Sequence, residues 1–124
     1  DFFCAAPREE EPLRQYIAST DADFLLAEQE GAVVGLALVL YAGWTPEFSC
    51  VLPHRYASLN DLVVLREKRR QGIGSTLLAA AKRWARDRRL EYLELNVLSQ
   101  NSEAIELYEA HDFVEATRTM RCML

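Results

Sequence analysis

The chain has 124 residues, of which 50% are hydrophobic and 27% are charged, a composition that is ordinary for a soluble globular protein. This length supports one sizeable core and is too short for two, so we expect residues 1–124 to form a single domain. No apolar run reaches the roughly 18–20 residues that a membrane span needs. The start of the chain lacks the basic region and long apolar stretch of a signal peptide. We therefore expect a cytoplasmic protein without a membrane partner.

The residues that usually hold metals or form disulfides are few and scattered. The three cysteines, Cys4, Cys50 and Cys122, form no C-x-x-C pair, and the two histidines, His54 and His111, do not cluster with them. This pattern disfavours a disulfide framework and fits a reducing compartment. It also predicts that the protein has no metal centre.

Charge is distributed unevenly along the chain, whose net charge is −5. Residues 1–30 carry eight acidic and two basic side chains, whereas residues 66–89 carry nine basic and two acidic ones. A basic block within an acidic protein indicates a local anionic ligand rather than a general affinity for nucleic acid.

The first half of the chain predicts a weak helix followed by strands. Apolar spacing gives the helix over residues 7–20, and residues 24–28 and 33–41 form a probable hairpin around a tight turn at Glu30-Gly31. Residues 43–46 then interrupt the strand pattern and predict a loop. A largely buried strand is expected over residues 59–65.

The second half alternates between helical and extended patterns. From Ser75 an apolar stripe at helical spacing predicts a helix that ends at Arg88 and Arg89, where cations complement the helix dipole. The remaining predicted elements are a strand over 92–97, a helix over 102–110, and closing strands over 113–116 and 119–124. This order indicates a mixed α/β sheet.

The most informative segment lies between the predicted strand at 59–65 and the helix that follows it. A basic loop, residues 66–71, leads into Gly72-Ile73-Gly74. Glycines at a strand-to-helix turn let the main chain approach a ligand closely, and their N–H groups converge with the helix N-terminus on an anion. Arg69 and Arg70 add donors that suit phosphate. The residues thus predict a pyrophosphate site.

Two familiar phosphate loops do not fit this segment. A Walker loop requires Gly-x-x-x-x-Gly-Lys-Ser/Thr, which is not present. The dinucleotide fingerprint requires a third glycine, and Leu77 stands at that position. What remains is an Arg-x-x-Gly-x-Gly pattern that begins at Arg69.

At this point the sequence resembles the GNAT superfamily of N-acetyltransferases, which carry Arg/Gln-x-x-Gly-x-Gly/Ala between their fourth strand and third helix. A second motif also matches: Asn101 lies seven residues before Tyr108 on a predicted short helix, and Phe113 follows. The resemblance covers roughly residues 24–124. It implies a mixed, mostly antiparallel sheet, flanked by helices, with a central V-shaped splay between two parallel strands.

The sequence departs from the family pattern in two places. Residues 1–20 offer no clear counterpart of the family's first strand. Asp112 stands where the family usually has glycine after the second helix. Aspartate can adopt the left-handed conformation that such a helix end requires, though less readily than glycine.

The resemblance implies an acyltransferase that moves an acetyl group from acetyl-coenzyme A to a primary amine by direct attack in a ternary complex. The expected phosphate contacts are the amides of residues 70–75, and Asn101 would bond the cofactor's arm. Main-chain groups of Leu62, Val63 and Val64 would pair with the pantetheine, and the N–H of Val64 would stabilise the oxyanion. The implied cofactor-binding set is Leu62, Val63, Val64, Arg69, Arg70, Gln71, Gly72, Ile73, Gly74, Ser75 and Asn101.

Catalytic groups follow less directly from the resemblance. Tyr108 would be the general acid for the departing thiolate. No general base is obvious: Asp61 and Glu94 are the available carboxylates, and each could act through water. A carboxylate at a strand edge is, however, more often solvated than catalytic.

The resemblance implies that the acceptor is a primary amine of a small molecule or a protein, and the partners expected are this acceptor and a second copy of the chain in a homodimer. The strand around Asn60 is similar to the cofactor strand of diamine acetyltransferases, but those carry an acid at that position. Tyr41, Trp44 and Phe48 flank a predicted loop and either line an acceptor pocket or pack locally. Two other functions remain open, namely a non-catalytic acyl-coenzyme A sensor and nucleic-acid binding through the basic helix.

Overall fold

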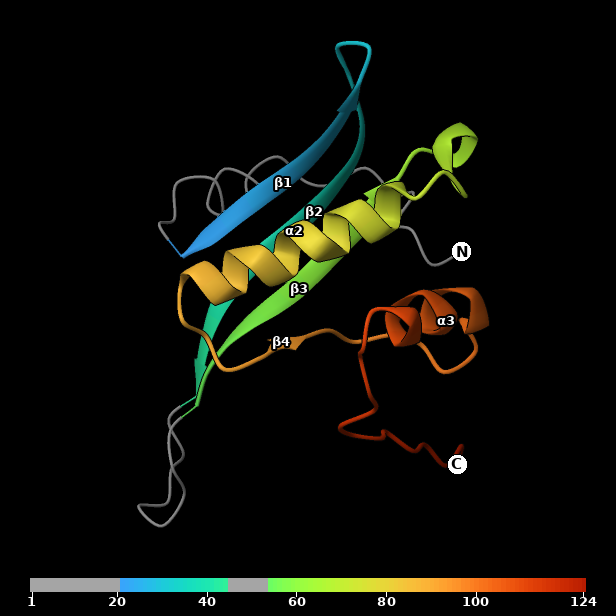
Figure 1. Cartoon of the computed structure of the whole chain (residues 1–124). Helices are drawn as coiled ribbons and strands as arrows, with labels where there is room; N and C mark the ends of the chain where they lie inside the picture. The colour runs from blue at the N-terminus through green and yellow to red at the C-terminus, as the bar shows by residue number, and fades with distance from the viewer. Residues whose placement is uncertain (1–20, 45–53) are drawn as a thin grey trace.

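The computed structural model describes residues 21–44 and 54–124 and combines one sheet with helices (Figure 1). Its elements in chain order are strands β1 (Ala22–Gln29), β2 (Ala32–Trp44) and β3 (His54–Val64), the 3₁₀ helix η1 (Arg66–Lys68), helix α2 (Ile73–Asp87), strand β4 (Leu93–Glu94) and helix α3 (Ser102–Ala110). The predicted helix over residues 7–20 lies outside the described residues.

The sheet has the order β1-β2-β3-β4. β1 and β2 form the predicted hairpin, whose turn has positive φ at both Glu30 (51°) and Gly31 (80°). β3 is antiparallel to β2, whereas β4 runs parallel to β3 and pairs with it only at Ala57↔Leu93 and Ser58↔Glu94. The predicted mixed, mostly antiparallel sheet with a parallel pair that splays apart is confirmed.

Several predicted strand limits are wrong. β2 continues to Trp44, so Gly43 belongs to the strand and not to a loop, and β3 starts at His54 rather than at Leu59. The strand predicted over 92–97 is paired only at Leu93–Glu94, because the chain then leaves β3 and heads for α3 (Figure 1). The closing strands predicted over 113–116 and 119–124 do not form. An alternating pattern needs a neighbouring strand to pair with, and none of the described residues supplies one.

The core lies between α2 and one face of the sheet, as Figure 1 shows. α2 buries the stripe that its sequence spacing predicts, including Leu77, Leu78, Ala81, Trp84 and Ala85. The helix begins at Ile73, two residues before the predicted start. Neither α-helix of the described part is long and apolar enough to cross a membrane.

The N-terminal end of α2 packs very closely on the sheet above Gly35 of β2. A methyl group built on Gly35 would lie 3.0 Å from the carbonyl oxygen of Val63, 3.1 Å from Ile73 Cγ2 and 3.1 Å from Leu77 Cδ1. Real Cβ atoms rarely come this close to main-chain atoms. Glycine at this position therefore lets the first turn of α2 sit directly against the end of β3.

The C-terminal end of α2 is fixed to β1 by polar contacts. Trp84 Nε1 donates to Asp23 Oδ2 at 2.7 Å, and Arg88 Nη2 donates to the same oxygen at 3.0 Å. The Arg88 guanidinium also lies over the Trp84 ring, 3.9 Å from its centroid. Both ends of the helix are thus held in place on the sheet.

Candidate active site

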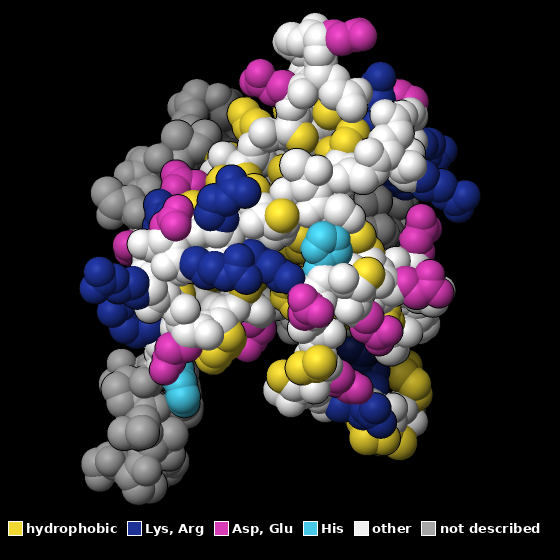
Figure 2. Space-filling view, viewed as in Figure 1, with side chains coloured by type: hydrophobic (Ala, Val, Ile, Leu, Met, Phe, Trp, Pro, Cys, Tyr) yellow, Lys and Arg dark blue, Asp and Glu magenta, His cyan; other side chains and the backbone are white. Residues whose placement is uncertain are grey.

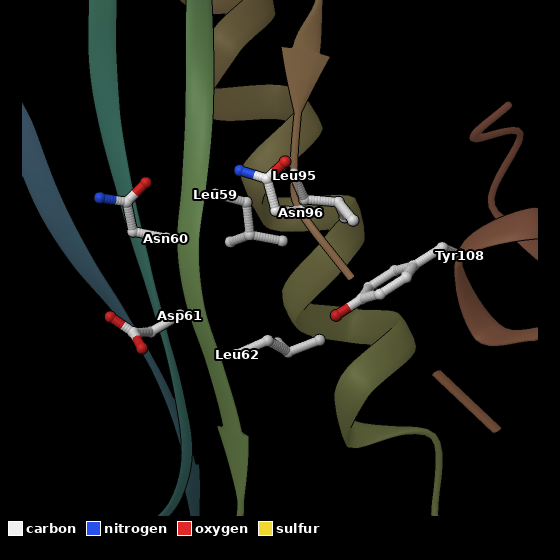
Figure 3. Close-up of a pocket in the computed structure, with 7 residues that line it drawn as sticks. All are labelled: Leu59, Asn60, Asp61, Leu62, Leu95, Asn96 and Tyr108. Atoms are coloured by element: carbon white, nitrogen blue, oxygen red, sulfur yellow. The ribbon is translucent and has the colours of Figure 1, made fainter. Parts of the chain in front are cut away.

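A β-bulge interrupts β3 where β3 and β4 begin to separate. The register with β2 shifts so that Leu38 faces Asp61 while Val39 faces Leu59, which leaves Asn60 as the extra residue. Because of the bulge, Asn60 and Asp61 point to the same side, and Leu59 and Leu62 both point to the other (Figure 3). The bulge therefore places two adjacent polar side chains on one wall of the opening.

Ser58 holds the first of these side chains in place. Its Oγ donates to Asn60 Oδ1 at 2.6 Å. Asn96, from the segment after β4, points back towards β3 (Figure 3). Two amides and one carboxylate, from β3 and from the segment after β4, are therefore among the groups that line the opening and could hydrogen-bond a polar ligand.

The outer edge of β3 is open beyond Ser58, the last residue that pairs with β4. The N–H of Leu65 donates to the carbonyl of Val34 in β2 at 2.9 Å. Main-chain groups of successive residues in an antiparallel strand alternate between its two edges. Val63 therefore faces β2, while Leu62 and Val64 direct their N–H and C=O groups into the gap. Of the three strand residues predicted to bind the cofactor, Leu62 and Val64 therefore direct their main-chain groups into the gap, and Val63 does not.

A cavity of about 100 Å³ occupies this gap. It is lined by Leu59, Asn60, Asp61, Leu62, Leu95, Asn96 and Tyr108. Tyr108 enters from α3 and turns its hydroxyl towards the leucine side chains on β3 (Figure 3). Tyr108, the predicted acid, and Asp61, one of the two candidate bases, both line this cavity. They do so from opposite sides of β3, because the Asp61 carboxylate points away from the leucines that the Tyr108 hydroxyl faces (Figure 3).

Tyr108 is 9% exposed and packs with the core, and its ring meets that of Phe113 in a tilted arrangement with centroids 5.8 Å apart. Burial raises the pKa of the Tyr108 phenol above its ordinary value of 10.0, because the phenolate would lose hydration there. The hydroxyl is consequently protonated at neutral pH and able to donate a proton.

Glu94, the other candidate base, is exposed and is not among the residues that line the cavity. It pairs with Ser58 in the register of β3 and β4, before the two strands separate. Tyr41, named as a possible acceptor-pocket residue, is half-buried and packs against the core. The side chain of Trp44 and all of Phe48 lie outside the description.

The glycine loop adopts the conformation that an anion site requires. Gly72 is the N-cap of α2 with φ 80° and ψ 9°, a left-handed conformation, and Arg70 is also left-handed with φ 62°. Left-handed residues alternating along a turn draw successive N–H groups to one side, and such concavities bind anions. No side chain caps the helix at Gly72. We call residues 70–75 the phosphate loop.

The first turn of α2 leaves its early N–H groups without partners inside the helix. The first helical bond runs from the N–H of Thr76 to the carbonyl of Gly72 at 3.0 Å, and Thr76 Oγ1 donates to the same carbonyl at 3.0 Å. The N–H groups of Ile73, Gly74 and Ser75 precede this bond. They stand at the positive end of the helix dipole, where a phosphate is favoured.

Basic side chains surround the phosphate loop. Arg69 directs its Nε towards the carbonyl oxygen of Val64 at 3.4 Å, whereas Arg70 and Gln71 are exposed. Figure 2 shows further Lys and Arg side chains along the face that α2 covers, farther from the loop. The loop therefore combines main-chain donors with positive charge at the end of β3.

Helix α3 spans the residues predicted for it, Ser102–Ala110. Asn101 is its N-cap, and its Oδ1 accepts the N–H of Ala104 at 3.3 Å. The cap does not use the Nδ2 group of Asn101, which is a donor. Asp112 has φ 70°, so it takes the left-handed conformation expected of the family's glycine.

Sequence reasoning missed three residues that shape this site. The extra residue Asn60 leaves no clear trace in a single strand, because a bulge is defined by its partner's register. Asn96 alternates with Leu93 and Leu95, a signal that could have placed it on the same wall. Gly35 interrupts an apolar strand, and a lone glycine in a strand often marks a close approach of another backbone. In the described ranges, no three His, Cys, Asp or Glu side chains gather as a metal site would need.

Comparisons with known proteins identify the family and support the fold. A family model described as the acetyltransferase (GNAT) family matches residues 1–113. An uncharacterized N-acetyltransferase of Bacillus subtilis, YhfO, is 34% identical over 105 residues, which is 85% of this chain and 67% of that protein. A thialysine N-epsilon-acetyltransferase of Caenorhabditis elegans is 31% identical over 73% of this chain, and the matched part spans about half (52%) of that enzyme.

Among solved structures, an aminoglycoside N-acetyltransferase, AAC(6')-Iy, in complex with CoA superposes with a TM-score of 0.76. The match covers 92% of this chain and 84% of that one at 18% identity, so it shows a common fold. The family match extends over most of the sequence and includes both motifs. The chain therefore belongs to the acetyltransferase (GNAT) family, and it is an enzyme of the N-acetyltransferase class.

Proposed function

We propose that this enzyme transfers the acetyl group of acetyl-coenzyme A directly to a primary amine while both substrates are bound. One observation carries the proposal: an uncapped helix start with left-handed Gly72 follows immediately after a strand whose main chain opens into a cavity. Acetyl-coenzyme A has a diphosphate that would lie at the helix start and a long arm, ending in a thioester, that would run along the strand into the cavity. The CoA complex of the aminoglycoside enzyme, which shares the fold, supports the same choice.

The cofactor's diphosphate would accept hydrogen bonds from the phosphate loop, with Arg69 and Arg70 supplying positive charge. Its pantetheine arm would pair with the main chain of Leu62 and Val64, whose groups face the gap. The Nδ2 group of Asn101 would donate to the arm from the start of α3. The thioester would then lie in the cavity, beside Tyr108.

The reaction begins when the neutral amine attacks the thioester carbonyl carbon. Negative charge develops on the carbonyl oxygen, and the N–H of Val64 would stabilise it by a hydrogen bond. Collapse of the tetrahedral intermediate breaks the carbon–sulfur bond. Tyr108 gives its proton to the departing thiolate, and the raised pKa of this phenol keeps it protonated until then. The proton that the attacking nitrogen loses as the amide forms would return through water to the Tyr108 phenolate.

A base must first remove a proton from the ammonium form of the acceptor, because an amine with a pKa near 10 is largely protonated at neutral pH. Asp61 is the better candidate, since it lines the cavity beside Asn60 and Asn96. It would act through a water molecule. Glu94 lies earlier on the strand pair and would instead attract a cationic acceptor from outside.

The acceptor that this cavity suits is a small amine with further polar groups, because two amides and a carboxylate are among the residues that line it. The names of the relatives point the same way: one acts on thialysine and the other on aminoglycosides. A lysine side chain of a peptide would present the same reacting group and belongs in the same test.

A pair of matched glycine variants tests the phosphate loop. Gly72 and Gly31 both have φ 80°, and neither has a neighbour within 4 Å of an added methyl group, but Gly31 lies in the β1–β2 turn. Aspartate at either position costs about 1–2 kcal/mol of backbone strain and adds one negative charge. We expect Gly72→Asp to abolish acetyl-coenzyme A binding in calorimetric titrations and Gly31→Asp to leave it unchanged. Equal binding by the two variants would refute the phosphate loop.

A second variant tests the acid. We expect Tyr108→Phe to lower kcat by about 100-fold or more, the usual contribution of a positioned acid. The affinity for acetyl-coenzyme A should be unchanged. Thiol release would be followed with a panel of polyamines, aminoglycosides, amino acids and lysine peptides. Binding of the cofactor without turnover of any amine would indicate a sensor, and unaltered turnover in Tyr108→Phe would remove Tyr108 from the mechanism.

A further inference from the structure

One basic residue of α2, Lys82, points to α3 rather than to solvent. Its side chain is 22% exposed, and its Nζ donates to the main-chain carbonyl of His111, directly after the last residue of α3. The same Nζ lies 3.8 Å from Asp112 Oδ2. A lysine at the C-terminal end of a helix satisfies a carbonyl that the helix leaves without a partner and complements the negative end of its dipole.

The turn that Lys82 holds folds back on Tyr108. The N–H of His111 and the N–H of Phe113 both donate to the carbonyl of Tyr108, at 2.9 Å and 3.1 Å. Left-handed Asp112, between them, reverses the chain direction. A shift of the His111 carbonyl would therefore be transmitted to the main chain of Tyr108.

A second contact joins the same groups through their side chains. The ammonium of Lys82 lies 5.8 Å from the centroid of the Phe113 ring, and that ring packs against the Tyr108 ring at 5.8 Å with a 59° tilt. Lys82 thus reaches Tyr108 along two routes, one through the main chain and one through Phe113. Lys82 itself does not line the cavity.

We propose that Lys82 is a positioning residue for the reaction: by binding the end of α3, it fixes the direction in which Tyr108 presents its hydroxyl to the cavity. The inference rests on the proposed role of Tyr108 as the acid. Proton transfer demands a short, well-aligned contact between donor and acceptor. A displacement of about 1 Å at a reacting group can lower a rate by about 100-fold.

The test compares three variants of α2 by steady-state kinetics and cofactor titration. Lys82→Met keeps the aliphatic stem and removes the charge and the donors, Lys82→Arg keeps both, and Arg83→Met removes a neighbouring exposed charge as a control. We expect Lys82→Met to lower kcat by about 10- to 100-fold. The Kd for acetyl-coenzyme A should change by less than about twofold, since the phosphate loop is untouched. Lys82→Arg should restore most of the rate, and Arg83→Met should match the parent enzyme.

A double-variant cycle separates positioning from general support of the fold. In the Tyr108→Phe background, Lys82→Met should cause no further loss of kcat, because no hydroxyl remains to be positioned. A full, additive loss in that background would overturn the inference, as would equal effects of Lys82→Met and Arg83→Met. These failures differ from failure of the proposed function, in which Tyr108→Phe alone would leave turnover unaltered.

Discussion

The close contact between α2 and the sheet makes a sharp prediction for Gly35→Ala. The added methyl group would stand 3.0 Å from the carbonyl oxygen of Val63 and 3.1 Å from carbons of Ile73 and Leu77. Val63 belongs to the main chain of β3, and Ile73 and Leu77 are 7% and 2% exposed, so none of the three can move without shifting an element. Overpacking of this kind typically costs about 1–3 kcal/mol.

Gly74→Ala provides the contrast, because its added methyl group would meet only Leu107 Cδ2, the end of a flexible side chain, at 3.3 Å. Replacing a helical glycine by alanine ordinarily stabilises by about 0.5–1 kcal/mol, which offsets a mild contact. In urea unfolding followed by circular dichroism, we expect Gly35→Ala to lower the free energy of unfolding by about 1–3 kcal/mol. Gly74→Ala should change it by less than about 1 kcal/mol. If Gly35→Ala were as stable as the parent, the packing argument for the start of α2 would be refuted.

Two other predictions concern stability. Asp23→Ala removes the hydrogen-bond acceptor shared by Trp84 and Arg88. Because this carboxylate is half-exposed, we expect the free energy of unfolding to fall by about 1 kcal/mol in the same urea assay. An unchanged urea midpoint would show that these contacts do not stabilise the fold. Burial raises the pKa of Tyr108, so the folded protein holds this proton more tightly than the unfolded chain does. The buried, protonated phenol therefore contributes fully to the free energy of unfolding below about pH 10. This contribution is lost as the pH rises through the raised pKa of Tyr108. The difference in free energy of unfolding between the parent and Tyr108→Phe should therefore be constant from pH 7 to 9 and fall above about pH 10. If the free energies of the two proteins changed in parallel up to pH 11, the burial argument would be contradicted.

The parts of the site that the sequence predicted depend on local interactions. Gly72 adopts a left-handed conformation that few residues tolerate, and Asn101 caps the helix that follows it in sequence. A helix is specified by its own residues and ends, so the limits of α3 were predicted correctly. The left-handed start of α2 and the place of Tyr108 on α3 follow from these local features.

The parts that were missed depend on neighbours distant in sequence. Residues 113–124 alternate as a strand would, yet they form none, because a strand is defined by its hydrogen-bonding partner. β4 stops after Glu94 for the same reason. The close approach above Gly35 joins residues from β2, β3 and α2, and no single segment contains that information. Which carboxylate meets the cavity likewise follows from the register of β3.

Because Asn60 is an extra residue in β3, the polar side chains at the opening can change without a change in the core. Two outward-facing residues, Asn60 and Asp61, occupy a place that one would fill in a regular strand, so Leu59 and Leu62 both keep their inward direction. Removing Asn60 would restore simple alternation without turning any apolar side chain outward. Most single-residue deletions in a strand invert every residue beyond them. At this point the strand can lose a residue, and hence change the polar side chains at the opening, while the interior stays the same.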